Sequence, residues 1–590
     1  MQVPESAIPG AYDKFPTIRV PGEHRAWQRG EVWSALADHA DGGTVVIDCY
    51  PGTDVGGVVD AVRKALPDAD VIDIETEAAL PPDRIDALIR RDLTDDSVFG
   101  LMSHHHLAEF YDEARLDAVA DRVTSRPGQS VLVGWGAALV PVESTTVVLA
   151  DLPRWEIQQR QRAGAPNWRA DNASAAPLTK FKRGYFVEWR TADEHKRALI
   201  GRVDFLLDTT RSVGEATLIT GAAFRAGLDA AVRRPFRVVP FFDPGVWGGQ
   251  WMKQVCGLDP DRENYAWCFD CVPEENSLLL EVGEQVVEIP ALDVVLARPA
   301  ELLGPRTFAR FGAEFPIRFD FLDTMGGGNL SLQVHPLTDY IQRTFGMHYT
   351  QDESYYLLDA GEDAVVYLGV QTGADREEMA RELRSAERGE SQFPAERYIN
   401  RFPAKRHDHF QIPAGTVHCS GANSMVLEIS ATPYIFTFKM WDWGRVGLDG
   451  IPRPIHLDHA LANIQWERDT EWTTQQLVDR VTPLATGDGW REERTGLHEL
   501  EFIEVRRHWF TGAVDHDTRG TVNVLNLVEG PEAVVESPDG AFEPFVVHYA
   551  ETFIVPADVG RYRIRPHGAG VGRECATVKA FVRGTTDGDV

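Results

Sequence analysis

The sequence predicts a multidomain protein in which an N-terminal α/β domain is followed by an all-β module of two barrel-like domains with a helical insertion. Three observations lead to this prediction. The chain has 590 residues, which is more than one hydrophobic core usually organises. Short β-like runs alternate with helical stretches between residue 30 and about 230, as in α/β domains. After Pro235 the pattern changes to strands separated by Gly, Pro and Asp, which is typical of sandwiches and barrels.

Composition and charge exclude several classes of function. The formal net charge of −31 would repel phosphate backbones, so we expect no nucleic-acid partner. The sequence contains no apolar run near the roughly 20 residues that a membrane helix needs, so we expect no membrane partner. The start MQVPESAIPGAYDKF lacks the features of a secretory signal, and six cysteines do not make a disulfide scaffold. We therefore expect a cytoplasmic protein, and the sequence leaves its oligomeric state open.

The first domain is predicted over residues 1–234. Its β-like runs include TVVIDCY and SVLVGWG, and its helical stretches include GGVVDAVRKAL and RLDAVADRV. This rhythm is typical of an α/β domain. The segment GEATLITGAAFRAGLDAAVRRPFR ends in a basic cluster before Pro235, so we place the first boundary near Arg234.

The β-rich remainder is predicted to form two domains, residues 235–465 and 466–590. The first contains SLLLEVG, NLSLQVHP, DAVVYLGV and SMVLEIS, and the second contains VNVLNLVEG, ETFIVPADVG and ATVKAFVR. The stretch TGADREEMARELRSAERGE interrupts the first β domain and puts Met379 and Leu383 on one helical face among charged residues. We interpret it as a surface helix inserted between strands.

Four polar residues of the first β domain have the pattern of a metal site. Gln333 and His335 are two residues apart in NLSLQVHP, a spacing that points both side chains to one face of a strand. Glu353 opens the strand-like run ESYYLLDA, and His418 follows the turn of IPAGTVHCSG. Two imidazoles, a carboxylate and an amide oxygen suit a divalent ion. Spacing alone does not decide the matter, because single histidines are more often ordinary surface or core residues.

The order of these segments along the chain supports the interpretation of a metal site. QVHP is followed by an acidic residue opening a Tyr-Tyr-Leu-Leu-Asp strand, then by PAGTVH and VLEIS. This order resembles that of type I phosphomannose isomerases of the cupin superfamily, over about residues 236–590. DPGVWGGQWMKQVCGLD and WDWGR extend the resemblance. It implies a double cupin or jelly-roll fold, Zn²⁺ as the cofactor, and interconversion of mannose 6-phosphate and fructose 6-phosphate.

Several cations of the family pattern are changed in this sequence. Gln351 and Asp320 stand where the family has lysines, and Lys439 in TFKMWDWGR stands where it has an arginine. Lys439 keeps the charge but loses the bidentate fork of arginine.

Four side chains outside the ligand set are the candidates for catalysis and substrate binding. We expect Lys439 and Glu428 to be catalytic, and Arg318 and Arg445 to bind the sugar phosphate. Because the positions that differ from the family are ones where the family has cations, a closely related sugar phosphate is an alternative substrate. Two other functions stay open: a non-catalytic sugar-phosphate sensor, and an iron-dependent cupin dioxygenase, since two His and one carboxylate also form the facial triad of that chemistry.

The N-terminal domain resembles a uridine kinase-like P-loop domain with a degenerate loop. TVVIDCYPGTDVGG has the strand, turn and helix context of a phosphate-binding loop, and VLVGWGAALV and LPRWEIQQRQR extend the similarity. A working loop needs a lysine for the phosphates and a hydroxyl for magnesium, but Val55 or Val58 stands at the lysine position. We therefore expect a scaffolding or regulatory domain without ATP chemistry.

Overall fold

The computed structural model describes residues 4–40, 43–143, 146–432, 435–448, 450, 452–499 and 501–586. The chain divides into two compact units. One unit consists of Thr17–Ala231 and Pro273–Arg298, and the other of Met1–Pro16, Val232–Val272 and Pro299–Val590.

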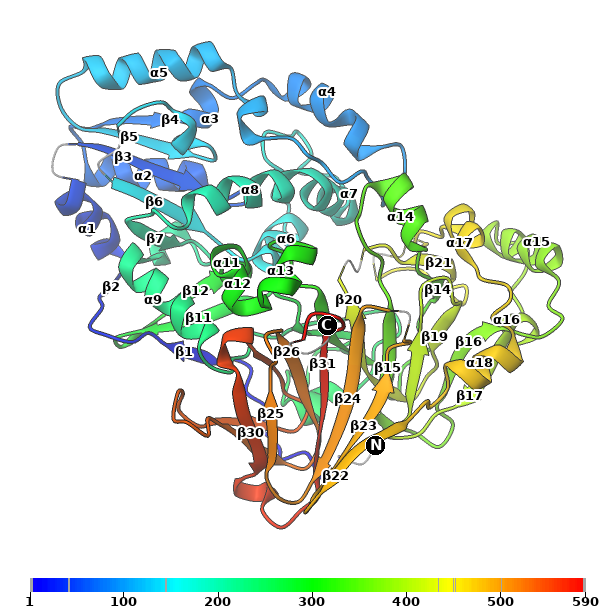
Figure 1. The fold of residues 1–590 in the computed structure, drawn as a ribbon. Coiled ribbons are helices and arrows are strands. Elements are labelled where there is room, and N and C mark those ends of the chain that lie inside the picture. The colour runs from blue at the N-terminus through cyan, green and yellow to red at the C-terminus, as the bar shows by residue number, and fades with distance from the viewer. Residues whose placement is uncertain are drawn as a thin grey trace. The chain divides into compact units, whose positions relative to one another are not determined.

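The first unit is built on a seven-stranded sheet with the order β2-β8-β7-β6-β3-β5-β4 (Figure 1, blue and cyan). The strands β4, β5, β3, β6 and β7 are parallel, and at one edge β8 pairs antiparallel with β7 and β2 pairs antiparallel with β8. Parallel strands are covered on both faces, so they read as continuous apolar runs such as SVLVG. The strands are β2 (Ala26–Gln28), β3 (Thr44–Cys49), β4 (Asp70–Asp73), β5 (Ser130–Gly134), β6 (Thr146–Asp151), β7 (Phe205–Asp208) and β8 (Thr217–Thr220).

Helices connect these strands, as the alternating sequence pattern predicts. Several begin at capping residues: Asp54 accepts a hydrogen bond from Gly57 N, and Asp112 accepts one from Arg115 N, which satisfies free N–H groups of the first turn. The helices of this unit are α1 (Gly30–Ala40), α2 (Val55–Ala65), α3 (Ile74–Glu77), α4 (Pro82–Leu93), α5 (Glu113–Ser125), α6 (Arg154–Arg162), α7 (Pro177–Arg183), α8 (Trp189–Leu199), α9 (Gly221–Val232) and α11 (Leu292–Ala297).

The compact units differ from the predicted domain boundaries in two segments. Residues 273–298 belong with the α/β unit, because β11 (Ser277–Val282) and β12 (Gln285–Pro290) form a three-stranded sheet with β1 (Thr17–Arg19). Residues 1–16 belong with the β-rich unit. Sequence periodicity identified the strand SLLLEVG, which is β11, but it did not identify β1 and carried no information on distant pairing partners.

The first barrel-like domain consists of two antiparallel sheets. One has the order β18-β15-β20-β13-β10-β9 and the other β17-β16-β19-β14-β21. The strands are β9 (Phe241–Asp243), β10 (Trp267–Cys271), β13 (Ile317–Asp323), β14 (Leu332–Val334), β15 (Glu353–Ala360), β16 (Val365–Val370), β17 (Ile399–Pro403), β18 (His409–Ile412), β19 (His418–Ser420), β20 (Ser424–Ala431) and β21 (Phe438–Trp441). This arrangement is compatible with a cupin-like fold.

The predicted helical insertion is confirmed. Helix α15 (Arg376–Glu387) lies between β16 and β17, and it is followed by the short α16 (Ala395–Tyr398). Met379 and Leu383 are both fully buried, so the apolar face of α15 packs against the protein while its charged residues face solvent.

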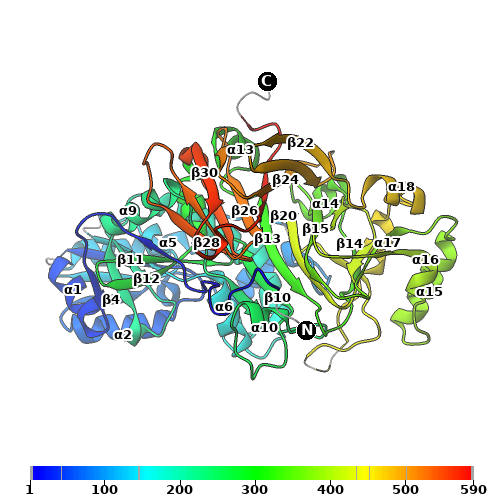
Figure 2. The same ribbon diagram turned by 90° about the horizontal axis from the view of Figure 1, so that it is seen from below.

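The second barrel-like domain also has two sheets, with the orders β22-β23-β24-β31-β26-β29 and β25-β30-β27-β28 (Figure 2, orange to red). Its apolar core includes Phe510, Leu525, Phe553 and Ile564. The strands are β22 (Thr482–Gly487), β23 (Trp490–Gly496), β24 (Ile503–Phe510), β25 (Val514–Asp517), β26 (Asn523–Glu529), β27 (Glu532–Glu536), β28 (Phe545–His548), β29 (Thr552–Val555), β30 (Arg561–Pro566) and β31 (Cys575–Val582).

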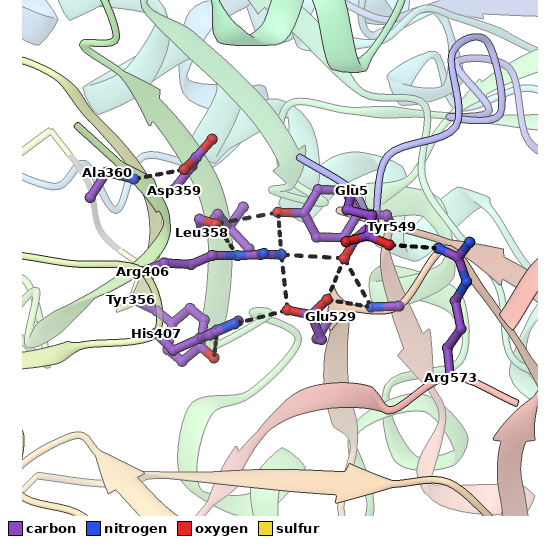
Figure 3. Close-up of polar contacts among 12 residues, drawn as sticks. Glu5, Tyr356, Leu358, Asp359, Ala360, Arg406, His407, Glu529, Tyr549 and Arg573 are labelled. Carbon is purple, nitrogen blue, oxygen red and sulfur yellow. Dashed lines mark hydrogen bonds and ion pairs between the residues drawn. The ribbon is translucent and has the colours of Figure 1, made fainter. Parts of the chain in front are cut away.

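A polar network joins the two β domains to the N-terminal segment of the same unit (Figure 3). Glu529 of the second domain contacts Arg406 and His407 of the first, each at 3.0 Å. Ser6 donates a hydrogen bond to Glu529, and the Tyr356 hydroxyl lies 2.8 Å from His407 Nδ1. These contacts explain why both β domains and residues 1–16 form one compact unit.

Candidate metal centre

Three strands of the first β domain bring the predicted ligands together. Gln333 of β14 is the direct cross-strand partner of His418, the first residue of β19. His335 follows the end of β14, and Glu353 is the first residue of β15 in the other sheet. All four side chains are buried. Because the two sheets face each other across the domain interior, the carboxylate meets the imidazoles there.

Donor atoms of His335, Glu353 and His418 lie within 4.8 Å of one another. The Nε2 atom of His335 is 3.1 Å from Glu353 Oε2, and the Nε2 atom of His418 is 2.9 Å from Glu353 Oε1. Within the described part of the chain, this is the one group of three such residues placed to hold a metal ion.

Backbone carbonyls define which nitrogen of each imidazole faces the cluster. His335 Nδ1 lies 3.2 Å from Phe436 O, and His418 Nδ1 lies 2.9 Å from Thr416 O. An Nδ1–H that donates to a carbonyl leaves Nε2 with a lone pair. Both lone pairs then face the Glu353 carboxylate, which is also an acceptor, so the cluster needs a cation. His335 Nε2 is buried and makes no hydrogen bond to the described residues.

The residues present fit a divalent metal ion. Burial opposes ionisation of Glu353, but positive charge on the His335 and His418 side outweighs burial and holds its pKa well below the usual range, and a metal ion between these groups would supply such a charge. Gln333 Nε2 lies 3.2 Å from His418 Nε2, and turning the amide over would direct Oε1 toward the cluster instead. Imidazole nitrogen, carboxylate and amide oxygen together form a donor set that zinc accepts.

Glu428 and Arg318 form a buried pair beside this cluster. Arg318 contacts Glu428 through a direct ion pair and lies 3.1 Å from Asp320 Oδ1. Burial, followed by the charges of Asp320 and Glu353, raises the pKa of Glu428 well above its usual range. Gln351 Nε2 donates to both Glu353 and Glu428, at 2.9 and 3.2 Å. Arg318 is thus already engaged by carboxylates.

Lys439 lies next to the ligand row on strand β21. It is the cross-strand partner of Gln333, so Lys439, Gln333 and His418 follow one another across three neighbouring strands. Burial, followed by the positive charge of Arg453, lowers the pKa of Lys439 to about 7. Within the described residues, its ammonium makes no hydrogen bond. This side chain can therefore exchange a proton near neutral pH.

Two arginines stand close to Lys439 and share one carboxylate. Arg445 Nη2 lies 2.6 Å from Asp442 Oδ1, and Arg453 Nη1 lies 3.0 Å from Asp442 Oδ2. Three cations thus surround one acidic side chain, an arrangement that favours an anion such as phosphate. Sequence reasoning missed Arg453, which lies in the loop segment RPIH and has no periodic pattern around it. The prolines that flank it were the only signal.

The N-terminal loop lacks the groups of a working phosphate-binding loop. Residues 50–58, YPGTDVGGV, contain no Lys or Arg. The Asp54 carboxylate accepts a hydrogen bond from Gly57 N at 3.0 Å, so an acid occupies the end of α2 where an anion would bind. A cleft of about 740 Å³ lies beside this loop and is lined by Tyr50, Glu75 and Trp168 among others. The predicted absence of ATP chemistry stays a prediction.

Comparison with known proteins gives different results for the two parts of the chain. Residues 30–233 match a family model described as a domain of unknown function, DUF8485. Mannose-6-phosphate isomerase ManA of Bacillus subtilis (strain 168) is 23% identical over 340 residues, which are 57% of this chain and 94% of that protein. Mannose-6-phosphate isomerase of Streptococcus mutans is 25% identical over 218 residues, which are 37% of this chain and 63% of that protein.

The solved structure of the mannose 6-phosphate isomerase from Bacillus subtilis is 18% identical to this chain and covers 59% of it. That match spans 99% of the solved chain with a TM-score of 0.46. Among the described residues, no helix combines the length and apolar character required to span a bilayer.

Proposed function

We propose that residues 236–590 form a metal-dependent aldose–ketose isomerase that interconverts mannose 6-phosphate and fructose 6-phosphate, or a closely related sugar phosphate. The observation that supports this most is that Lys439, whose side chain can exchange a proton, lies close to the cluster of His335, Glu353 and His418. Lys439 is the cross-strand partner of Gln333, which lies beside this cluster. The mannose-6-phosphate isomerases that align with more than half of the chain support the same function.

Zinc is the metal we propose, with Gln333, His335, Glu353 and His418 as its ligands. When bound, such an ion supplies Lewis-acid stabilisation of the charge that develops on the sugar oxygens. The buried imidazoles keep their orientation through their Nδ1 contacts to backbone carbonyls. Those contacts also keep each Nε2 available as a ligand.

Proton transfer between C1 and C2 of the sugar needs a group that titrates near neutral pH. Lys439 has this property because its pKa is about 7. Glu428 is the second catalytic candidate, because its raised pKa allows it to take up a proton in the buried site. We propose that Arg318 positions Glu428 through their ion pair, while a substrate contact by Arg318 itself stays a prediction.

The phosphate group is proposed to bind at Arg445 and Arg453. Each already contacts Asp442, which fixes the direction of its guanidinium, and the remaining N–H groups can form charge-assisted hydrogen bonds to phosphate oxygens. Lys439 adds a third positive charge when it is protonated.

A coupled assay with mannose 6-phosphate tests the proposal. We expect turnover by zinc-loaded protein and its loss in His335→Ala, with His348→Ala as the control because His348 is an exposed histidine of the same domain. If zinc-loaded wild-type protein binds the sugar phosphate without converting it, isomerisation is excluded and the sensor function remains. Oxygen uptake by protein that contains iron would point to a dioxygenase instead.

A further inference from the structure

The second β domain contains an open cleft of about 730 Å³ that does not include the His/Glu/His cluster. Six of its lining side chains are Arg or Lys and four are Asp or Glu, whereas the whole chain has a net charge of −31. The sign of the charge is therefore locally reversed, which favours an anionic ligand in this cleft.

The strands that build the cleft carry apolar inward side chains toward one end and ionisable inward side chains toward the other. On β24, His508 and Arg506 share the face of the core residue Phe510, because alternate residues point to the same side. On the paired strand β31, Thr577 lies opposite His508 and Lys579 lies opposite Arg506. Inward positions of small barrels are usually filled with packed side chains. Here ionisable residues replace apolar ones toward one end of the domain.

Lys579 is a cation in this cleft that no described carboxylate contacts directly; its ammonium lies 5.8 Å from the centre of the Phe581 ring. Its side chain is 8% exposed, and within the described residues it makes no hydrogen bond or ion pair. The nearby acids are engaged elsewhere: Glu492 contacts Arg506 at 3.0 Å, and Glu504 contacts Arg506 at 2.6 Å. Burial lowers the pKa of Lys579 to about 8. A buried ammonium that no carboxylate contacts is costly, so an anion placed there would reduce that cost.

Arg519 adds a second available cation. It is an exposed residue that lines the same cleft as Lys579, and its positive charge contributes to lowering the pKa of Lys579. Within the described part of the chain its guanidinium has no acidic partner. Lys579 and Arg519 can therefore contact the same anionic group from the interior and from the rim.

His508 supplies a hydrogen-bond acceptor beside these cations. Its Nε2 lies 3.2 Å from Glu492 Oε1, so the N–H is at Nε2 and the lone pair is at Nδ1. Nδ1 is buried and has no hydrogen-bond partner among the described residues. Burial lowers the pKa of His508 to about 4, so the ring is neutral. An acceptor of this kind pairs with a hydroxyl group and would repel a bare anion.

We propose that this cleft is a second binding site, for a small hydroxylated anion: a carboxylate or phosphate monoester that also carries hydroxyl groups. Lys579 and Arg519 bind the anionic group, and His508 Nδ1 accepts a hydrogen bond from a hydroxyl. This site does not depend on the proposed isomerase activity, because it shares no residue with the metal cluster.

Isothermal titration calorimetry on the full chain tests this site. The probes are gluconate and sorbitol 6-phosphate, which carry both groups, together with sorbitol and inorganic phosphate, which carry one each. The titrations use the His335→Ala background to reduce binding at the metal cluster. We expect gluconate or sorbitol 6-phosphate to bind at least about tenfold more tightly than either single-group probe, a difference typical of one additional well-formed hydrogen bond. Binding of gluconate would identify a carboxylate as the anionic group of the ligand, and binding of sorbitol 6-phosphate would identify a phosphate monoester.

Matched variants connect the binding to this cleft. We expect Lys579→Met and Arg519→Gln each to weaken the binding by about tenfold or more, while Lys405→Met, at an exposed lysine of the first β domain, leaves it unchanged. Arg519 is exposed, so its variant remains informative if Lys579→Met does not fold. Absence of binding by all four probes would overturn the proposal, and so would unchanged binding in the Arg519→Gln variant.

Discussion

At the residue scale, the balance between burial and neighbouring charge decides what each ionisable group can do. Lys439 and Arg318 are both cations near the same cluster, but they differ in their partners. Arg318 has two carboxylates in contact, whereas Lys439 is next to Arg453, and burial lowers its pKa to about 7. Lys439 can therefore exchange protons, while Arg318 remains charged and holds Glu428 in place.

The lowered pKa of Lys439 predicts how activity depends on pH. If the neutral amine accepts the substrate proton, kcat should rise as the pH passes through about 7, where Lys439 loses its proton. Lys439→Arg stays protonated, so we expect it to lose roughly 10²- to 10⁴-fold in kcat, the usual contribution of a general base. A pH–rate profile of both proteins checks this. The same profile in both would remove Lys439 from proton transfer.

At this scale, the proximity of the candidate ligands could be predicted from the sequence, but the arrangement of the cations around them could not. The spacing of Gln333 and His335 places those two side chains on one face of a strand, the family resemblance adds Glu353 and His418, and the structure brings His335, Glu353 and His418 together. Arg453 could not be found, because a loop residue has no periodicity and its approach to Lys439 depends on the path of the chain. The engagement of Arg318 by Asp320 and Glu428 likewise depends on cross-strand pairing, which the sequence does not specify.

At the element scale, strands β13 and β20 carry a row of buried charges. Asp320 of β13 is the cross-strand partner of Glu428 of β20, and Arg318 is the partner of Ser430. Arg318 hydrogen-bonds to the Ser430 hydroxyl at 3.1 Å as well as pairing with Glu428. Two acids and one arginine thus share the interior face of this sheet.

Removing the arginine should destabilise the domain strongly. We expect Arg318→Met to lower the free energy of unfolding by about 3–5 kcal/mol, because it leaves buried carboxylates without their counter-charge. The double variant Arg318→Met with Glu428→Gln should recover part of that loss, since one charge is then removed. Urea denaturation of Arg318→Met, Glu428→Gln and the double variant measures these free energies of unfolding. If the losses of the single variants simply add in the double variant, the two residues are not coupled.

Strand identity was easier to predict than strand partnership. The β-rich character of residues 235–590, the alternation of the first domain and the helix α15 all follow from local periodicity. The pairing of β1 with β11 joins residues 17–19 to residues 277–282, a separation that no local pattern encodes. The position of residues 273–298 therefore could not be predicted from the sequence.

At the scale of the whole molecule, the β-rich unit is held together by contacts between segments that are far apart in sequence. Glu529 joins Ser6, Arg406 and His407 (Figure 3). Burial opposes the charge of Glu529, but these partners outweigh it and lower its pKa to about 2. A carboxyl group whose pKa is lowered on folding stabilises the native state above its unfolded pKa, and this contribution is lost as the pH falls through the folded value.

Glu529→Gln should therefore destabilise the protein in a pH-dependent way. We expect a loss of about 3 kcal/mol near pH 7, estimated from the size of the pKa shift. The difference in the free energy of unfolding between the variant and wild type should shrink as the pH falls from the unfolded pKa of about 4.5 to the folded pKa of about 2. Unfolding by urea at several pH values measures it. Glu5→Gln is the control, since Glu5 is highly exposed and its contact to Arg573 is 3.9 Å. Equal stability of Glu529→Gln and wild type at neutral pH would contradict this account.

Metal content tests the central claim most directly. Mass spectrometric analysis of the purified protein should find one divalent ion per chain, with zinc as the metal that we propose. Both His335→Ala and Glu353→Gln should lose the ion, because each removes a donor from a cluster whose atoms lie within 4.8 Å, and His348→Ala should keep it. Wild-type protein that binds no divalent ion when zinc is supplied, or a His335→Ala variant that retains a full equivalent, would contradict the metal centre on which the proposed function rests.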